Sequence, residues 1–261
     1  MLCKDIMHIL EEIFPTEYAL EWDNVGLLVG RDQKEVKKIY IALDATEEVI
    51  QTTIKEQADM LITHHPMIFN GIKRVTGENL VGRKVLDLAL NDISYYAMHT
   101  NYDVKGMADL AMEKMGVYSG EVLDVTAVEE DGREEGVGRV WDLPENTTLS
   151  NCCQLVKEAF GLDAVRLFGD PEAMVHRLAI CPGAGKNDID LAVKKGADVY
   201  VTGDIGHHDG LDALEEGLAI IDAGHYGVEH IFIEDIKTFL EDNLQDVEVI
   251  AAPIEHPFVT I

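Results

Sequence analysis

Ala58-Asp59-Met60-Leu61-Ile62-Thr63 and Ala197-Asp198-Val199-Tyr200-Val201-Thr202 are two copies of one short apolar strand, and this pair decides the fold. Each copy ends a segment that reads as strand, turn, helix and strand, over Lys38 to Thr63 and over Arg177 to Thr202. A strand followed by a helix and a second strand is typical of a parallel βαβ unit. The sequence therefore predicts two related βαβ segments, one in each half of the chain.

The spacing within the two segments favours a true duplication. Asp44 precedes Asp59 by 15 residues, and Gly183 precedes Asp198 by the same 15. Any two βαβ units resemble each other in length, so similar length alone would carry little weight. The alignment needs no gap, and the Ala-Asp and Thr positions agree together, which indicates one unit copied rather than two unrelated units.

A second pattern follows each copy: a strand that ends in His, with an acid four residues later. It reads His99-Thr100-Asn101-Tyr102-Asp103 in the first half and His225-Tyr226-Gly227-Val228-Glu229 in the second. His99 lies 36 residues after Thr63, whereas His225 lies 23 residues after Thr202. We place the 13 extra residues of the first half in a loop over 67–79, which contains two glycines and several charged residues.

The order of the apolar segments predicts the fold class. Short apolar runs alternate with segments whose apolar residues recur at three- and four-residue spacing. We expect an internally duplicated α/β fold with two closely packed α/β lobes, each with a mostly parallel sheet flanked by helices. The first lobe is predicted to comprise residues 1–127 plus 220–261 and the second residues 128–219, with a metal site between the lobes. The predicted strands are 39–43, 60–62, 93–98, 178–180, 199–201 and 218–221, the predicted helices are 47–57, 80–91, 107–115, 189–195 and 228–243, and a hairpin joins 122–128 to 136–143.

Composition limits the partners. The 261 residues include 21 basic and 49 acidic ones, for a net charge of −28. The negative electrostatic field of such a chain repels nucleic acid and anionic membranes, so binding to either is not expected. A phosphate-bearing substrate would need local cations, for which metal ions are the best candidates. The alternative explanation of the acidity is solubility or a salty cytoplasm.

The remaining composition points to a cytoplasmic protein. Residues 1–13 are amphipathic and do not resemble a secretory signal, and no apolar run approaches the roughly 20 residues of a membrane helix. Cys3, Cys152, Cys153 and Cys181 show no CxxC spacing, so we expect reduced thiols.

Histidines collect at the expected carboxyl ends of the strands, which are His64, His65, His99 and His225. In a parallel sheet, sites form at this edge. A single such histidine would be explained as a core or capping group, but adjacent histidines with acids at matching positions favour a metal site. Because neighbouring strand residues point to opposite faces, we expect the chain to leave the strand at about Thr63, helped by Pro66.

Asp103 and Glu229 are the expected carboxylate ligands, although an acid near a helix start is also stabilised by the helix dipole alone. Three imidazoles and two carboxylates exceed the needs of one zinc ion, and a carboxylate can bridge two ions. The sequence therefore predicts a dinuclear centre. Mixed nitrogen and oxygen ligation suits Zn, Mn, Fe, Co or Ni, so we expect two divalent ions of this group per chain.

Five motifs in order resemble the Ngg-interacting-factor-three-like family, whose members are often described as homologs of GTP cyclohydrolase I type 2. The motifs are Glu21-Trp22-Asp23-Asn24-Val25-Gly26-Leu27, Thr63-His64-His65-Pro66, His99-Thr100-Asn101-Tyr102-Asp103, Thr202-Gly203-Asp204 with His207-His208, and Asp222-Ala223-Gly224-His225 with Glu229. The resemblance covers essentially the whole chain. It implies a duplicated α/β fold, a dinuclear metal centre, a toroidal homohexamer with the metals facing its cavity, and the short form without an inserted domain.

The resemblance also implies roles for single residues. It places His65 and Asp103 on one ion, His64 and His225 on the other, and Glu229 as the bridge. His99 is not a ligand in the family's pattern, so we expect it to hydrogen-bond Asp103 or a ligand imidazole and to act as a catalytic residue. His207 and His208 are candidates for proton transfer or substrate contact, with ordinary surface histidines as the alternative.

Two loops have less specific interpretations. Pro182-Gly183-Ala184-Gly185-Lys186 precedes an expected helix, and its amides could hold an anion, although a tight turn is the favoured explanation and the segment is not a Walker loop. Asp23 and Asn24 are expected to support the site, and Trp22 is expected to be packed.

These features favour a metal-dependent hydrolase of the GTP cyclohydrolase I type 2 kind. A water bridging two ions would attack a carbon or phosphorus atom, and a nearby histidine would protonate the leaving group. The resemblance implies opening of the GTP imidazole ring, while another C–N bond or a phosphoester fits the same ligands, so the substrate is expected to be a small molecule such as a nucleotide. The alternative is a hexameric metal-binding or regulatory scaffold without turnover.

Overall fold

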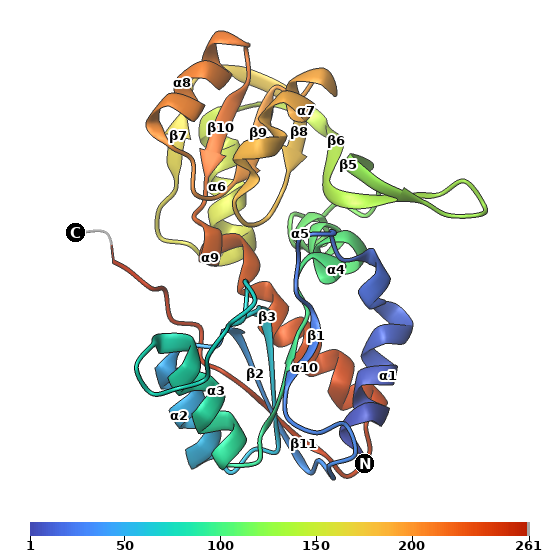
Figure 1. The fold of residues 1–261 in the computed structure, drawn as a ribbon. Helices are drawn as coiled ribbons and strands as arrows, with labels where there is room; N and C mark the ends of the chain where they lie inside the picture. Colours follow the sequence, from blue (N-terminus) through green and yellow to red (C-terminus); the bar gives the residue numbers. More distant parts are fainter. Residues whose placement is uncertain (260–261) are drawn as a thin grey trace. The chain divides into compact units, whose positions relative to one another are not determined.

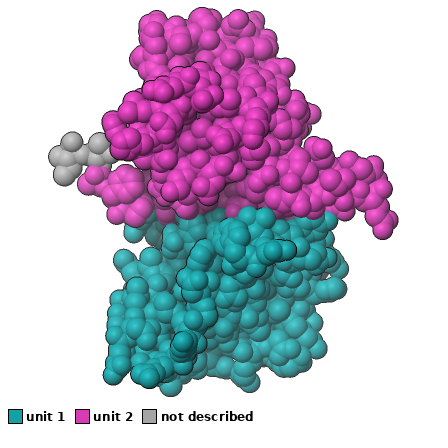
Figure 2. Space-filling view, turned by 45° about the horizontal axis from the view of Figure 1, so that its top comes forward, with its two compact units in different colours: residues 1–102, 232–255 teal, residues 103–231, 256–261 magenta. Residues whose placement is uncertain are grey.

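The computed structural model describes residues 1–259 and divides them into two compact units. Unit 1 comprises Met1–Tyr102 and Phe232–Glu255, and unit 2 comprises Asp103–Ile231 and the tail from His256 (Figure 2). Each unit is built on its own β-sheet with helices against it (Figure 1). The predicted α/β fold class is therefore confirmed.

The sheet of unit 1 has five strands in the order β1-β4-β3-β2-β11. Its strands are β1 (Gly26–Val29), β2 (Lys38–Asp44), β3 (Met60–His65), β4 (Ser94–Ala97) and β11 (Glu248–Ala251), and its helices are α1 (Cys3–Ile13), a 3-10 turn at Thr16–Tyr18, α2 (Glu47–Lys55), α3 (Leu80–Leu90), α4 (Thr100–Tyr102) and α10 (Ile231–Asn243). β11, β2, β3 and β4 pair in parallel, and β1 pairs with β4 in antiparallel fashion. This sheet is mostly parallel, as predicted.

Alternation along the central strands buries both faces of this sheet. Tyr95 belongs to the core cluster that lies under α2 and α3, together with Ile50 and Leu88 from those helices. Its neighbour Tyr96 points the other way and donates a hydrogen bond to Glu11 of α1 at 2.8 Å. α1 and α10 cover this second face (Figure 1). Two-sided burial is what the near-continuous apolar strands predict.

The sheet of unit 2 has six strands in the order β5-β6-β8-β9-β10-β7. Its strands are β5 (Glu121–Val128), β6 (Glu134–Thr148), β7 (Arg166–Phe168), β8 (Met174–Ile180), β9 (Val199–Thr202) and β10 (Ala219–Asp222), and its helices are a π-helical turn at Asp103–Met107, α5 (Ala108–Lys114), α6 (Leu149–Phe160), a 3-10 turn at Gly185–Asp188, α7 (Ile189–Lys194), α8 (His207–Glu215) and α9 (His225–Glu229). β8, β9 and β10 are parallel, but the pairs β5-β6, β6-β8 and β10-β7 are antiparallel. Unit 2 is therefore mixed rather than mostly parallel, because a hairpin and a short strand flank its parallel centre.

The unit boundaries differ from the predicted lobes. They fall at Tyr102/Asp103 and Ile231/Phe232, whereas the prediction placed them at 127/128 and 219/220. β5 belongs to unit 2 because it pairs with β6 along its length, and β10 belongs there because it lies between β9 and β7. The predicted hairpin itself is confirmed, as β5 and β6 pair from Val128↔Glu134 to Glu121↔Val140.

The two halves share hydrogen bonds that bear out the duplication. Oδ2 of Asp59 accepts hydrogen bonds from the amides of Lys37 and Lys38 at 2.8 and 3.2 Å. Oδ2 of Asp198 accepts from the amides of His176 and Arg177 at 2.7 and 2.8 Å. Each aspartate thus fastens the first strand of its βαβ unit to the start of the second. The repeated Ala-Asp pair is explained by this contact.

Two further observations concern the whole chain. All four cysteines are free thiols, as expected. No helix within residues 1–259 combines the length and the apolar character required to cross a membrane.

Candidate metal centre

His64 and His65 are the last two residues of β3, and the strand continues through both. His65 pairs with Asp44 in the parallel ladder, so the expectation that the chain leaves the strand at Thr63 is wrong. Both imidazoles nevertheless approach each other, with ring centroids 4.9 Å apart. The side chains come together because they stand at the open end of the strand, where each ring can turn across the sheet edge.

His99 completes a histidine cluster within unit 1. It follows β4, and its ring centroid lies 5.2 Å from that of His64 and 5.6 Å from that of His65. One ligand atom from each of these three residues lies within 4.8 Å of the others, which is close enough to hold one metal ion. His64 is fully buried, and only 15% of the His99 side chain is exposed. The strand ends thus gather three imidazoles in a largely enclosed place.

Each imidazole of this cluster is oriented through Nδ1. His64 Nδ1 lies 2.7 Å from the carbonyl oxygen of Met98, His65 Nδ1 lies 2.8 Å from Asp44, and His99 Nδ1 lies 2.9 Å from Asp23. A carbonyl or carboxylate oxygen only accepts, so Nδ1 carries the hydrogen in all three rings and Nε2 keeps its lone pair. This arrangement, with the second ring nitrogen bound to a carboxylate or carbonyl, is characteristic of histidines that coordinate metals.

Asp23 supports the cluster from the loop before β1. Its carboxylate also accepts a hydrogen bond from the amide of Thr100 at 3.0 Å and from the Thr100 hydroxyl. Burial raises the pKa of Asp23, but the hydrogen bonds from His99 and Thr100 outweigh it and bring the pKa down to about 2. Asp23 is therefore ionised at neutral pH and fixes the His99 ring. The predicted supporting role of Asp23 agrees with these contacts.

The contacts of His99 correct one expectation. His99 was expected to hydrogen-bond Asp103 or a ligand imidazole, but its Nδ1 bonds to Asp23 instead. Asp23 precedes β1, which pairs with β4 at the Gly26↔Ala97 position, so the ladder brings the loop with Asp23 next to the residue that follows β4. His99 therefore has a carboxylate of its own, and its Nε2 faces the cluster.

His225 and Glu229 form the corresponding group in unit 2. Both lie on α9, one turn apart, and His225 Nε2 is 2.9 Å from Oε2 of Glu229. His225 Nδ1 is 3.0 Å from Asp204, so this ring is oriented in the same way as those of unit 1. Glu229 is only 3% exposed. A buried carboxylate and an oriented imidazole thus meet at the carboxyl end of the second sheet.

Asp103 joins the unit 2 group from another element. It opens the π-helical turn that follows α4. A carboxylate oxygen of Asp103 lies within 4.8 Å of one of Glu229, and an oxygen of Glu229 lies within 4.8 Å of a His225 nitrogen. Such π-helical turns often occur at functional sites because they redirect one side chain out of the regular helical repeat. Glu229 therefore has a predicted ligand on either side.

Two glycines make room for this group. A Cβ at Gly183 would overlap Oε1 of Glu229, and one at Gly203 would overlap the backbone nitrogen of His225. The loop with Gly183 was considered as a possible anion site, but the amide of Gly185 donates to Thr202 at 2.9 Å and the Gly183 carbonyl accepts from Gly203 at 2.8 Å. The loop is a tight turn against a carboxylate, in agreement with the favoured interpretation.

Two further predicted site residues lie on another helix of unit 2. His207 and His208 begin α8, both are exposed, and their rings contact each other at 5.2 Å. Trp22 was expected to be packed, but it is 56% exposed.

The sequence prediction missed the supporting role of Asp44 and Asp204. Asp44 ends a strand and Asp204 follows one, so the signal was a carboxylate at a strand end beside each histidine.

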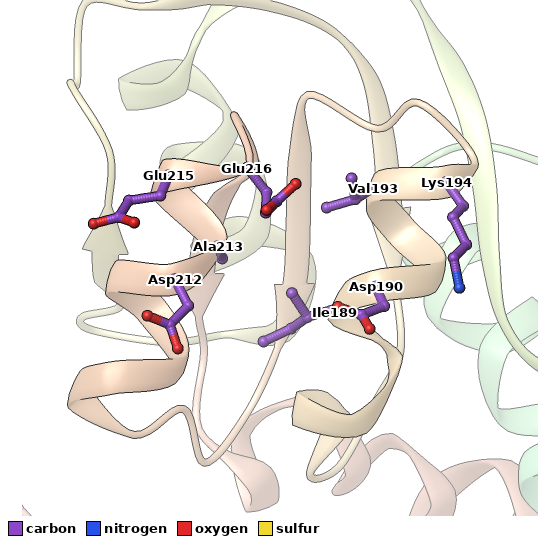
Figure 3. A pocket seen from close by; sticks show the side chains of 8 residues that line it. All are labelled: Ile189, Asp190, Val193, Lys194, Asp212, Ala213, Glu215 and Glu216. Atoms are coloured by element: carbon purple, nitrogen blue, oxygen red, sulfur yellow. The ribbon is translucent and has the colours of Figure 1, made fainter.

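A separate surface groove lies between α7 and α8 of unit 2 and encloses about 560 Å³ (Figure 3). Its apolar residues are Ile189, Val193 and Ala213, and its charged residues are Asp190, Lys194, Asp212, Glu215 and Glu216. None of the predicted site residues lines this groove. It is distinct from the histidine and carboxylate groups.

Comparisons with known proteins agree with the architecture. Residues 1–257 match the family model described as Duf34/NIF3 (NGG1p interacting factor 3). Similar proteins named "GTP cyclohydrolase 1 type 2 homolog" include one from Clostridium perfringens, 36% identical over 262 residues and 99% of both chains, and one from Lactococcus lactis, 39% identical over 89% of both chains. Among solved structures, a Bacillus cereus protein related to NIF3 matches with a TM-score of 0.92 at 26% identity, covering 100% of this chain and 99% of that one. Reduced HcgD from Methanocaldococcus jannaschii matches with a TM-score of 0.81 at 33% identity, covering 96% and 97%.

Proposed function

The chain belongs to the Duf34/NIF3 (NGG1p interacting factor 3) family, and from this premise we propose that it is a metal-dependent hydrolase acting on a nucleotide or a related C–N or phosphoester bond. One observation carries the proposal. His64, His65, His99 and His225 all contact an oxygen through Nδ1, which leaves Nε2 as the nitrogen available for coordination. A set of unrelated core histidines would not share this orientation.

The donor set fits two divalent ions of the Zn, Mn, Fe, Co or Ni group. We propose His65 and Asp103 as ligands of one ion, His64 and His225 as ligands of the other, and Glu229 as the bridge. The position of Glu229 within 4.8 Å of both Asp103 and His225 supports the bridging role. His99 is close enough to His64 and His65 to add a further nitrogen ligand or to position a substrate.

Several residues of the chain have defined roles in such a reaction. Divalent ions supply a nucleophilic water at neutral pH and stabilise negative charge as it develops. Asp23, Asp44 and Asp204 hold the imidazoles in one tautomer and one orientation. Full burial of His64 beside Phe232, at 5.2 Å between ring centroids, limits the access of bulk water from that side. We propose His207 and His208 as proton donors to the leaving group.

The relatives' names support a nucleotide as the substrate, because they are homologs of a GTP cyclohydrolase by name. The net charge of −28 adds to this, since bound cations would be needed to hold a phosphate. We also propose the toroidal homohexamer that the sequence resemblance implies. A non-catalytic metal-binding scaffold is the alternative that the experiments below must separate.

Metal stoichiometry is the decisive first measurement. Elemental mass spectrometry is applied to the native protein, His64→Ala and Glu229→Ala after reconstitution with each candidate ion. The exposed His8 pairs only with the exposed Glu12, so His8→Ala is the matched control. We expect two ions per chain in the native and control proteins and loss of at least one in each site variant. One ion or none in the native protein would contradict the dinuclear centre.

Turnover then separates the hydrolase from the scaffold. His207→Ala and His208→Ala lie on exposed positions and should leave the metal content unchanged. In a screen of GTP and simple phosphoesters, we expect turnover by the loaded native protein and at least a tenfold loss in one of the two variants, consistent with about 10²–10⁴-fold effects of general acid catalysis. A loaded protein without turnover on any substrate favours the scaffold.

A further inference from the structure

Trp22 and Phe69 are large aromatic residues that unit 1 leaves exposed. Trp22 is 56% exposed and Phe69 is 49% exposed. The other tryptophan, Trp141, is only 4% exposed. Scattered exposed apolar residues are normal on a protein surface, but two large rings in contact are a patch that suggests a ligand.

The two rings lie beside the histidine cluster. Their centroids are 5.5 Å apart, with an angle of 41° between the planes. Trp22 also contacts His99 at 5.9 Å, edge to face, and Phe69 contacts the same imidazole at 6.3 Å. His99 is therefore the candidate site residue beside both rings.

Both rings are held in place by polar contacts of their neighbours in the chain. Asp23, next to Trp22, binds His99 and Thr100. Asn24 donates from Nδ2 to the carbonyl of Ile68, next to Phe69, at 2.6 Å. These bonds join the loop before β1 to the loop after β3 and fix the two exposed rings relative to His99. A preorganised aromatic surface loses less entropy on binding than a flexible one.

The loop that carries Phe69 also carries positive charge. Lys73 and Arg74 are both exposed on it, in a chain whose net charge is −28. Two exposed cations on the loop that carries Phe69 favour a ligand that combines a planar ring with an anionic group.

We propose that Trp22 and Phe69 form a stacking site for the planar heteroaromatic ring of a phosphorylated substrate, next to His99. The ring rests on the aromatic faces, and its phosphate is attracted by Lys73 and Arg74. The inference rests on the proposed function for the reaction that takes place beside this site, but ring binding itself does not require turnover. It assigns substrate selection to residues that coordinate no metal.

Tryptophan fluorescence tests the site directly. In a Trp141→Phe background, Trp22 is the sole tryptophan, and the indole nitrogen of Trp141 makes no hydrogen bond in the described part of the chain, so this change breaks none. The metal-free protein is titrated with guanosine 5′-monophosphate and, separately, with ribose 5-phosphate. We expect saturable quenching by the nucleotide and none by the sugar phosphate over the same concentrations. Equal responses to both probes would overturn the proposal.

Two substitutions sharpen the result. Phe69→Leu should weaken the nucleotide Kd by about 5- to 150-fold, the range for loss of one stacking contact. Phe258→Leu removes another exposed phenyl ring, 68% exposed, and should leave Kd unchanged. Quenching that is identical in both variants would contradict the site. A Trp22 emission that shifts with protein concentration would place a second copy of the chain on the rings and would also overturn it.

The test separates this inference from the proposed function. Metal content and turnover are measured on the same Phe69→Leu protein. Nucleotide quenching without turnover would leave the stacking site standing and contradict the hydrolase. Turnover of a substrate that lacks an aromatic ring, with a rate unchanged by Phe69→Leu, would support the hydrolase and overturn the stacking site.

Discussion

The ends of β3 and β9 are equivalent positions in the two halves, yet they carry different chemistry. β3 ends in Thr63-His64-His65, and β9 is followed by Gly203-Asp204 after Thr202. The backbone around both is the same, since the amides of Met98 and Ala223 bond to the carbonyls of Thr63 and Thr202 at 2.9 and 2.8 Å. The same scaffold thus supplies imidazoles in one half and space for a carboxylate in the other.

A single additional residue explains much of this difference. His99 directly follows Met98, whereas Gly224, with φ of 75°, stands between Ala223 and His225. This extra residue carries the His225 backbone over Gly203, where any Cβ would overlap it. The second half therefore has no room for a counterpart of His64. Counted between residues that pair in the parallel ladder, the first half has 14 more residues before β4 than the second half has before β10, rather than the predicted 13. The second half has one more residue, Gly224, between its strand and its histidine, so the two histidines differ by 13.

The preceding strand shows the same division. Asp44, at the end of β2, binds His65. Its counterpart in the repeat is Gly183, which lies against Glu229. Where the first half uses a carboxylate to orient an imidazole, the second half uses a glycine to admit a carboxylate.

The largest effect is expected from Gly203→Ala. The new methyl group meets backbone atoms of Gly224 and His225, which cannot rotate away, so we expect a loss of about 3 kcal/mol in the free energy of unfolding of unit 2. Urea unfolding is followed by Trp141 fluorescence in a Trp22→Phe background. Gly217→Ala is the control, because Gly217 has a φ of 84° but no atom within 4 Å of a Cβ, and should cost only about 1 kcal/mol of backbone strain. Equal losses in the two variants would contradict the steric explanation.

Asp44→Asn, Asp23→Asn and Asp204→Asn test whether the two halves orient their imidazoles to the same degree. Each substitution keeps the shape but weakens the hydrogen bond to Nδ1, so metal affinity should fall about 10- to 100-fold. Competition with a chromophoric chelator measures the Kd for each metal. Asp87→Asn changes a carboxylate that bonds only Gln51, at 2.9 Å, and should have no effect. If only the unit 1 variants lose affinity, the equivalence of His225 with the other histidines fails.

Parts of this arrangement were predictable from the sequence because they depend on local pattern. The duplicated strands, the histidines at their ends and the Asp59 and Asp198 positions follow from spacing alone. The pairing of Asp44 with His65 depends on the register between β2 and β3, which no local pattern encodes. The bond from Asp23 to His99 joins residues 76 positions apart. Gly224 adds one residue between the second strand and His225. Aligning the two halves by sequence alone does not reveal this extra residue.

Asp59→Asn and Asp198→Asn test the shared part of the scaffold. Each replaces a carboxylate oxygen that accepts two backbone amide hydrogens, so each should cost about 1–2 kcal/mol. Denaturant unfolding with Trp22 as the reporter for unit 1 and Trp141 for unit 2 compares the two losses. Asp59 also lies 3.3 Å from Lys34 Nζ, so its loss should be slightly larger. A loss of unfolding free energy in only one of the two variants would show that the two contacts are not equivalent.

The smallest effect concerns the pH dependence that Asp23 gives to unit 1. Its pKa is about 2 in the folded protein, below the ordinary value of 3.8 that applies when the chain is unfolded. The unfolded state therefore binds the proton more tightly, so the stabilisation is fully present above about pH 4 and disappears as the pH falls towards about 2. We expect this difference in pKa to contribute about 1 kcal/mol of stability. The difference in unfolding free energy between the metal-free native protein and Asp23→Asn should shrink by most of this amount between about pH 6 and about pH 2.5. A difference in unfolding free energy that stays constant over this range would mean that Asp23 holds His99 by shape rather than by charge. His99 would then differ from a histidine that is oriented for metal coordination.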